Sequence, residues 1–187
     1  LITLYETAKS LKRTVMICHV LRYAPFYSEI KKCILNGDIG DIINIQTNEH
    51  VVYHHMSVGY VRGKWNNKEK CGSPILMAKS CHDLDIITWL ANDIPVKVSS
   101  FGGLHYFTKD NAPKNSGNRC LCDCPKDVEN NCLYSARKIY LNHPDRWDFF
   151  VWHDLEVQLG RKATLEEKEQ SLKTDNPHGR CVYKCDN

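Results

Sequence analysis

The sequence predicts an α/β or α+β fold, because segments with helical spacing alternate with segments that have the composition of strands. Apolar residues recur at helical intervals in several segments, whereas β-branched residues concentrate in others. The chain has 187 residues, of which 42% are apolar. This length fits one domain of ordinary size or two small ones, and the apolar share is enough to bury a core.

The first fifty residues show the alternation most clearly. Leu4, Ala8 and Leu11 fall on one face of a helix. Pro25 suits the first turn of a second helix, and Gly37 suits the left-handed cap at its end. The expected elements are a helix over 1–12, a strand buried on both faces over 14–21, a helix over 25–35 and a strand over 41–53.

The remainder of the chain contains the strongest helix signal and a cysteine-rich loop. Pro74 lies near the start of that helix, and Thr164 with Glu167 three residues later forms a capping-box pattern. Gly102 and Gly103 predict a bend in a strand. The expected elements are a loop over 58–71, a helix over 74–92, a strand over 96–107, a cysteine-bearing loop over 111–131, helices over 133–141 and 164–172, and the beginning of a strand over 179–184.

Composition excludes several classes of protein. The net charge of +3 is too small, and the charges are too scattered, to predict binding of nucleic acid. The sequence contains no run of 18 apolar residues, so it predicts no membrane-spanning helix. Residues 1–12 are amphipathic rather than continuously apolar, so we expect no signal peptide and a cytoplasmic location. Because the chain starts with Leu1 rather than Met, we expect it to be a piece of a longer protein.

One face of the expected helix over 74–92 combines three groups that can carry acid–base chemistry. Lys79 is three residues before His82 and four before Asp83, so a cation, an imidazole and a carboxylate can lie together on a helix. Histidine titrates near neutral pH and is the usual proton carrier. The alternative is a solvated salt bridge beside a structural histidine.

The cysteines are concentrated late in the chain. Cys120, Cys122, Cys124 and Cys132 lie in one loop, at spacings that allow tetrahedral Zn²⁺ to be chelated. If the loop supplies three of the four ligands that zinc needs, the fourth could be Cys181 or Cys185 near the end of the sequence. The loop therefore predicts a structural zinc clip, with free thiols or adventitious disulfides as the alternative.

Five short motifs carry a resemblance to a known family. They are HVLRYAP at 19–25, ILNGDIGDI at 34–42, VRGKW at 61–65, KSCHDLD at 79–85 and GRCVY at 179–183. In this order they resemble the Gfo/Idh/MocA family of NAD(P)-dependent oxidoreductases. The resemblance covers most of the chain, with gaps around the cysteines.

The resemblance implies two domains. Residues 1–23 would be the last helix and strand of a truncated Rossmann domain, and residues 24–187 a substrate-side domain, an open mixed or antiparallel sheet with helices on one face, truncated at its C-terminus. The pyrophosphate-binding G-x-G-x-x-G turn occurs nowhere in the sequence, so we expect the chain alone to bind NAD or NADP weakly. Unfinished sheet edges predict a homo-oligomer.

The resemblance also implies an activity: hydride transfer between a nicotinamide and the hydroxyl of a sugar or polyol. His82 matches the family's proton-transfer histidine. The aspartate often found four residues earlier is Ala78 here, which leaves Lys79 as the nearest ionisable substitute. Lys79 and His82 are therefore the predicted catalytic residues. A non-catalytic oligomerisation or zinc-stabilised interaction module is the alternative function, and a stand-alone metal-binding protein is a third.

Further residues are assigned to binding roles. Arg22 is predicted to contact the cofactor, although it could instead hold a substrate hydroxyl or a structural carboxylate. The predicted substrate-binding residues are Tyr23, Arg62, Trp65 and Asp83. Within the cysteine cluster, the set typical of one branch of the family is Cys120, Cys124, Cys132 and Cys181.

Overall fold

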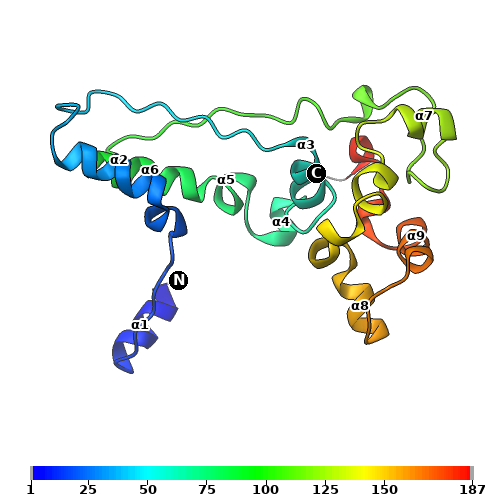
Figure 1. Cartoon of the computed structure of the whole chain (residues 1–187), viewed down its shortest axis with the longest axis horizontal. Helices are drawn as coiled ribbons and strands as arrows, with labels where there is room; N and C mark the ends of the chain where they lie inside the picture. The colour runs from blue at the N-terminus through cyan, green and yellow to red at the C-terminus, as the bar shows by residue number, and fades with distance from the viewer. Residues whose placement is uncertain (1, 186–187) are drawn as a thin grey trace. The chain divides into compact units, whose positions relative to one another are not determined.

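The computed structural model describes residues 2–185 (Figure 1). These residues form two compact units. The first unit consists of the described residues of Leu1–Asn48 together with Ser80–Val98. The second unit consists of Glu49–Lys79 and the described part of Ser99–Asn187. Each unit is therefore built from two separate stretches of chain, and the predicted division at residue 23 stays a prediction.

Residues 2–185 are helical or extended and contain no β-sheet, so the predicted open sheet with helices on one face is wrong. The four segments predicted as strands, 14–21, 41–53, 96–107 and 179–184, form no ladder. Between residues 2 and 185 there is a single isolated antiparallel bridge, which pairs Arg119 with Arg180. A strand needs a partner for its backbone N–H and C=O groups, and a β-branched composition alone supplies none.

The side chains of the extended segments agree with this correction. Ile43 is 92% exposed and Phe101 is 97% exposed, so neither packs on a neighbouring layer. The first predicted strand ends instead in a 3₁₀ turn, η1 (Val20–Tyr23), and the second gives way to helix α3 (Tyr53–Met56).

The first unit contains three α-helices, and two of them match the predicted boundaries closely. They are α1 (Ile2–Ser10), α2 (Pro25–Leu35) and α6 (Cys81–Ala91). Lys31 of α2 is only 8% exposed, and its ammonium donates to the carbonyl oxygens of Trp89 at 2.6 Å and Leu90 at 3.3 Å. The last carbonyls of a helix have no partner within it, so Lys31 caps α6 and fixes α2 beside it.

The single helix predicted over 74–92 is wrong. The chain forms α5 (Ile75–Ala78), leaves helical geometry at Lys79, whose φ is −124°, and begins α6 at Cys81. Lys79 and His82 are therefore not three residues apart on one helix, and the spacing argument for a shared face does not apply.

The second unit consists of short helices and turns around two apolar clusters. The α-helices are α3 (Tyr53–Met56), α4 (Lys68–Cys71), α5 (Ile75–Ala78), α7 (Lys126–Asn131), α8 (His153–Leu159) and α9 (Leu165–Lys173). The π-helical turns are η2 (Ser57–Val61), η4 (Arg137–Leu141) and η6 (Asp148–Trp152). The 3₁₀ turns are η3 (Lys109–Asn111), η5 (Pro144–Arg146), η7 (Pro177–Gly179) and η8 (Val182–Lys184).

The larger cluster is centred on Tyr140, Trp152 and Leu172, each of which has no exposed surface. The smaller cluster joins Val61 to Tyr134 and to residues near the C-terminal end. The loop predicted over 58–71 is thus partly wrong, because η2 is wholly buried and belongs to the core.

Helix α9 confirms the capping box. The Thr164 hydroxyl accepts from the Glu167 amide, while the Glu167 carboxylate accepts from the Thr164 amide. Both bonds satisfy N–H groups that the helix leaves unpaired at its start. Among the residues that the structure describes, none of the helices is both long and apolar enough to cross a bilayer.

Candidate functional site

In the first unit, the side chains of Arg22, His19 and Asp85 lie close together. Arg22 donates two hydrogen bonds to the Asp85 carboxylate, at 2.8 and 2.5 Å, and His19 Nε2 lies 3.6 Å from the same carboxylate. The hydrogen bonds from Arg22 hold the pKa of Asp85 below its usual value, in spite of burial. Arg22 thus binds a structural carboxylate here, which is one of the roles considered for it, and its cofactor role stays a prediction.

His82 lies on α6, one turn before Asp85. Its Nδ1 is buried and has no hydrogen-bond partner among the described residues. Buried polar nitrogens are rarely left unsatisfied, and an exception calls for an explanation such as a missing ligand. His82 also lowers the pKa of Asp85 through its charge, so the two groups are electrostatically close.

Lys79 belongs to the second unit, where its ammonium lies 2.9 Å from the Glu49 carboxylate. His82 and Asp83 belong to the first unit. The structure therefore gives Lys79 a carboxylate partner of its own and does not establish the predicted catalytic pair.

Arg62 is the most buried charged residue among the polar groups of the described core, at 1% exposure. Its guanidinium donates to the carbonyl oxygens of Arg180 at 2.6 Å and Tyr134 at 2.8 Å, and to Ser57 Oγ at 3.0 Å. It also reaches the Tyr140 hydroxyl and the sulfur of a cysteine, each at 3.3 Å. No Asp or Glu of residues 2–185 forms an ion pair with it.

This environment keeps Arg62 charged. Burial lowers its pKa, but the neighbouring Tyr140 and Cys120 outweigh that effect, so the pKa is raised overall. Arg62 ties η2 to the segments around Tyr134 and Arg180, which are far away in sequence. Its side chain is thus a structural crosslink of the second unit.

A cleft of about 500 Å³ opens beside this crosslink. Trp65, predicted as a substrate contact, lines it and stacks on Tyr60 with ring centroids 5.7 Å apart. The Lys64 ammonium lies 4.3 Å from the centre of the Trp65 ring. The other charged groups of the lining include Lys70, Arg180 and Asp154, so cations outnumber anions. The structure brings Arg62 and Trp65 to one cleft, where Arg62 contributes mainly buried atoms, and their substrate-binding roles stay predictions.

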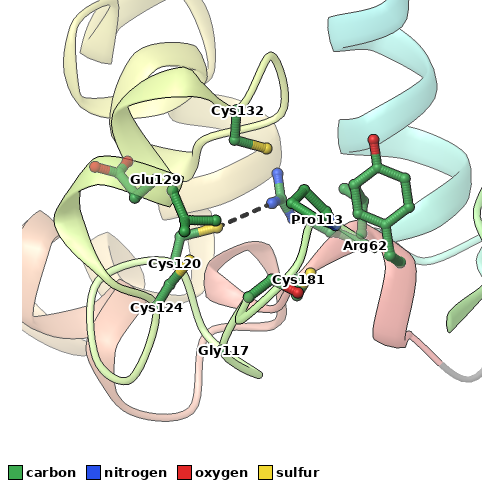
Figure 2. A pocket seen from close by; sticks show the side chains of 12 residues that line it. Arg62, Pro113, Gly117, Cys120, Cys124, Glu129, Cys132 and Cys181 are labelled. Atoms are coloured by element: carbon green, nitrogen blue, oxygen red, sulfur yellow. Dashed lines mark hydrogen bonds between the residues drawn. The ribbon is translucent and has the colours of Figure 1, made fainter. Parts of the chain in front are cut away.

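The predicted metal ligands line a second, much smaller pocket of about 20 Å³ (Figure 2). Cys120, Cys124, Cys132 and Cys181 all face it, together with Arg62. Within residues 2–185, no three His, Cys, Asp or Glu side chains are already gathered as ligands of one metal ion. The four thiols therefore share a pocket without forming a finished coordination site.

Just over half of the chain matches the model of a known protein family. Residues 31–130 match the model described as "Oxidoreductase family, C-terminal alpha/beta domain", that of the Gfo/Idh/MocA oxidoreductases. The chain belongs to this oxidoreductase family. The match includes Arg62, Trp65 and His82 and ends in the cysteine-rich segment.

One relative supports the same assignment. The chain is 28% identical over 128 residues to the Bacillus subtilis (strain 168) protein "Putative oxidoreductase YteT". The aligned region is 66% of this chain and 28% of that protein, so the chain spans less than a third of its relative's length. No solved structure matches the chain significantly.

Two residues of this Gfo/Idh/MocA chain were missed by sequence reasoning. Asp85 organises the charged group of the first unit, and its place one turn after His82 was the available signal. His178 is 5% exposed and its Nε2 donates to the Val58 carbonyl oxygen at 3.2 Å. Nothing in its local sequence indicates that burial, which lowers its pKa to about 4. Tyr23 and Asp83 keep their predicted roles untested.

Proposed function

We propose that this chain supplies substrate-side residues of an oxidoreductase that transfers a hydride between NAD or NADP and the hydroxyl of a sugar or polyol. Family membership supports the reaction class. The observation that carries the role of this chain is the buried, unpartnered Nδ1 of His82. A substrate hydroxyl is a partner that would satisfy it.

In the proposed reaction a bound nicotinamide supplies the hydride acceptor. As the carbinol C–H bond breaks, the hydroxyl becomes a carbonyl and must release its proton. His82 takes that proton at a ring nitrogen, and the charge on the imidazole is offset by Asp85. Arg22 holds Asp85 ionised and oriented, so it acts as a positioning residue.

The cleft beside Trp65 supports a carbohydrate ligand. Trp65 lines the cleft with an aromatic ring of the kind that packs against the apolar side of a sugar, and stacking on buried Tyr60 supports that ring. The excess of cations in the lining favours a sugar that carries a carboxylate. We therefore propose that this cleft of the second unit binds an acidic sugar better than a neutral one.

The test uses the whole protein that contains this chain. Reduction of NAD⁺ and NADP⁺ is followed by nicotinamide absorbance with a panel of neutral sugars, polyols and sugar acids. His82→Ala should lower turnover by about 100-fold, the size expected for a lost general base. His105→Ala, an exposed histidine of the second unit, is the matched control and should leave turnover unchanged. Near-equal turnover of wild type and His82→Ala would remove the role of His82.

If the chain is instead a non-catalytic oligomerisation or interaction module, the same panel should give the opposite result. We then expect no nicotinamide reduction with any sugar, together with concentration-dependent association in analytical ultracentrifugation. Homo-oligomerisation itself is compatible with both functions, so the redox readout is the one that separates them.

A further inference from the structure

We propose that Cys120, Cys124, Cys132 and Cys181 bind one Zn²⁺ ion as four thiolates in the pocket beside Arg62 (Figure 2). Three kinds of observation support this site, and none of them depends on the proposed oxidoreductase activity. They concern the backbone that carries the cysteines, the choice among six cysteines, and the two polar side chains that meet the pocket.

The isolated bridge aligns two of the four thiols. Around the Arg119–Arg180 pair, the Cys120 amide donates to the Gly179 carbonyl oxygen at 2.9 Å, and the Cys181 amide donates to Asn118 at 2.8 Å. Neighbours of a bridged pair project to the face opposite the pair itself. Cys120 and Cys181 therefore present their thiols on the same side, although they are 61 positions apart.

The loop after the bridge returns Cys124 to the same place. The Asp123 carboxylate accepts from the amides of Asn118 at 2.9 Å and Arg119 at 2.8 Å, which closes the loop. A Cβ on Gly117 would lie 2.4 Å from the Cys124 nitrogen, so only glycine permits this close approach. Helix α7 then ends at Asn131, and Cys132 follows as its C-cap.

Two nearby cysteines are directed elsewhere, which selects the four. The Cys122 thiol is on an exposed residue and donates to the Lys173 carbonyl oxygen at 3.0 Å. The Cys185 thiol donates to the Cys181 carbonyl oxygen at 3.3 Å. Neither residue lines the pocket. The pocket thus holds the same four cysteines that the family resemblance implies, where spacing alone leaves the ligands open.

Two polar groups that line the pocket, the Arg62 guanidinium and Ser116 Oγ, suit an anionic centre between the thiols. Buried Arg62 forms no ion pair with a carboxylate of residues 2–185, and it donates to the Cys120 sulfur at 3.3 Å. Ser116 Oγ lines the same pocket, buried and without a hydrogen-bond partner among the described residues. A zinc ion with four thiolates carries a charge of −2, which a buried guanidinium offsets, and N–H or O–H donors to the sulfurs are the usual support of such sites.

Binding requires the four sulfurs to move toward one point. The pocket of about 20 Å³ has room for one ion, and the thiols are not gathered around one point in the structure. Rotation about Cα–Cβ moves each sulfur between staggered positions, and zinc–sulfur distances of about 2.3 Å draw them together. Zn²⁺ replaces four thiol protons, so binding releases four protons to solvent and involves no change of oxidation state.

The test is the metal content of the full chain, purified without chelators or nickel columns and measured by mass spectrometry. We expect about one zinc per chain in wild type, and less than about a tenth in Cys120→Ser and Cys181→Ser. Cys122→Ser, two positions from Cys120, is the matched control and should keep its zinc. Less than about a tenth of a zinc in wild type, iron in place of zinc, or equal loss in Cys122→Ser would overturn the site.

A second measurement does not depend on whether the variants fold. Co²⁺ added to the metal-free wild-type chain should give the intense visible and near-ultraviolet bands of tetrahedral cobalt thiolate, saturating at about one equivalent and bleached by Zn²⁺. Weak octahedral bands alone, or disulfides between these cysteines in the chain as purified, would contradict a four-thiolate site. Neither result bears on the redox activity proposed above, so the two proposals fail separately.

Discussion

Each unit contains an arginine that joins segments far apart in the sequence, and the two arginines differ in their burial and in their binding partners. Arg22 in the first unit is partly exposed, with 38% of its side chain accessible, and binds Asp85 through two hydrogen bonds. Arg62 in the second unit is 1% exposed and binds carbonyls, hydroxyls and a thiol in place of a carboxylate. One is an ion pair near solvent, and the other is a buried cation held by neutral groups.

The difference shows what each arginine contributes. An ion pair near solvent gains little net free energy, because water and side-chain entropy oppose it. A buried guanidinium without a carboxylate persists only if nearly all of its donors are satisfied, and its removal exposes several buried acceptors at once. We therefore expect the second unit to depend far more strongly on Arg62 than the first unit depends on Arg22.

The largest expected effect is that of Arg62→Gln. The shorter amide cannot reach both the Tyr134 and Arg180 carbonyl oxygens, so we expect a loss of about 3–5 kcal/mol in the free energy of unfolding. Urea denaturation followed by tryptophan fluorescence measures it. Arg137→Gln is the matched control, because Arg137 pairs with Glu169 at the surface, and it should cost less than about 1 kcal/mol. A loss below 1 kcal/mol for Arg62→Gln would contradict the expectation that the second unit depends more strongly on Arg62 than the first unit depends on Arg22.

The next effect concerns pH and the buried His178, which packs against Tyr140, a residue that Arg62 also contacts. Burial lowers its pKa to about 4, whereas the unfolded chain has the usual value near 6.5. Between those values the unfolded state holds the extra proton, so stability is complete above about pH 6.5 and falls as the pH drops toward 4. We expect a loss of about 2 kcal/mol between pH 7 and pH 5.

Urea denaturation of wild type and His178→Gln at both pH values checks this. The variant should lose clearly less stability than wild type over the same interval, since glutamine does not titrate. Identical pH dependence of the two proteins would show that His178 is not buried in its neutral form.

The smallest expected effect is that of Arg22→Gln, which should destabilise the protein less than Arg62→Gln. The hydrogen bonds from Arg22 lower the pKa of Asp85, so their contribution is present above the unfolded value of about 3.9 and is lost as the pH falls through the folded value. Carboxyl carbon NMR should show the pKa of Asp85 rising in the variant. An unchanged Asp85 titration would mean that the pair does not persist in solution.

The sequence anticipates elements that depend on neighbouring residues and misses those that depend on distant ones. The first-turn proline gives α2 its observed start, and Thr164 with Glu167 gives α9 its cap. The sheet prediction failed because a strand is a property of two paired segments, and Ile43 or Phe101 can be apolar without having a partner.

The same rule holds for the candidate sites. The motif around His82 and the family match are local in sequence, and both point to an oxidoreductase. The pairing of Lys79 with Glu49 and of Arg22 with Asp85 joins segments whose contact no spacing rule predicts. The four cysteines are already singled out by the family resemblance, whereas the Arg119–Arg180 bridge that aligns two of them joins distant segments and follows from no local pattern.

We propose that this chain is part of a nicotinamide-dependent oxidoreductase, and calorimetric titration of NADH and NADPH into the whole protein tests that proposal most directly. We predict saturable binding of at least one of the two at about one site per chain. Failure of both to bind, in protein that unfolds cooperatively and is therefore folded, would contradict the claim.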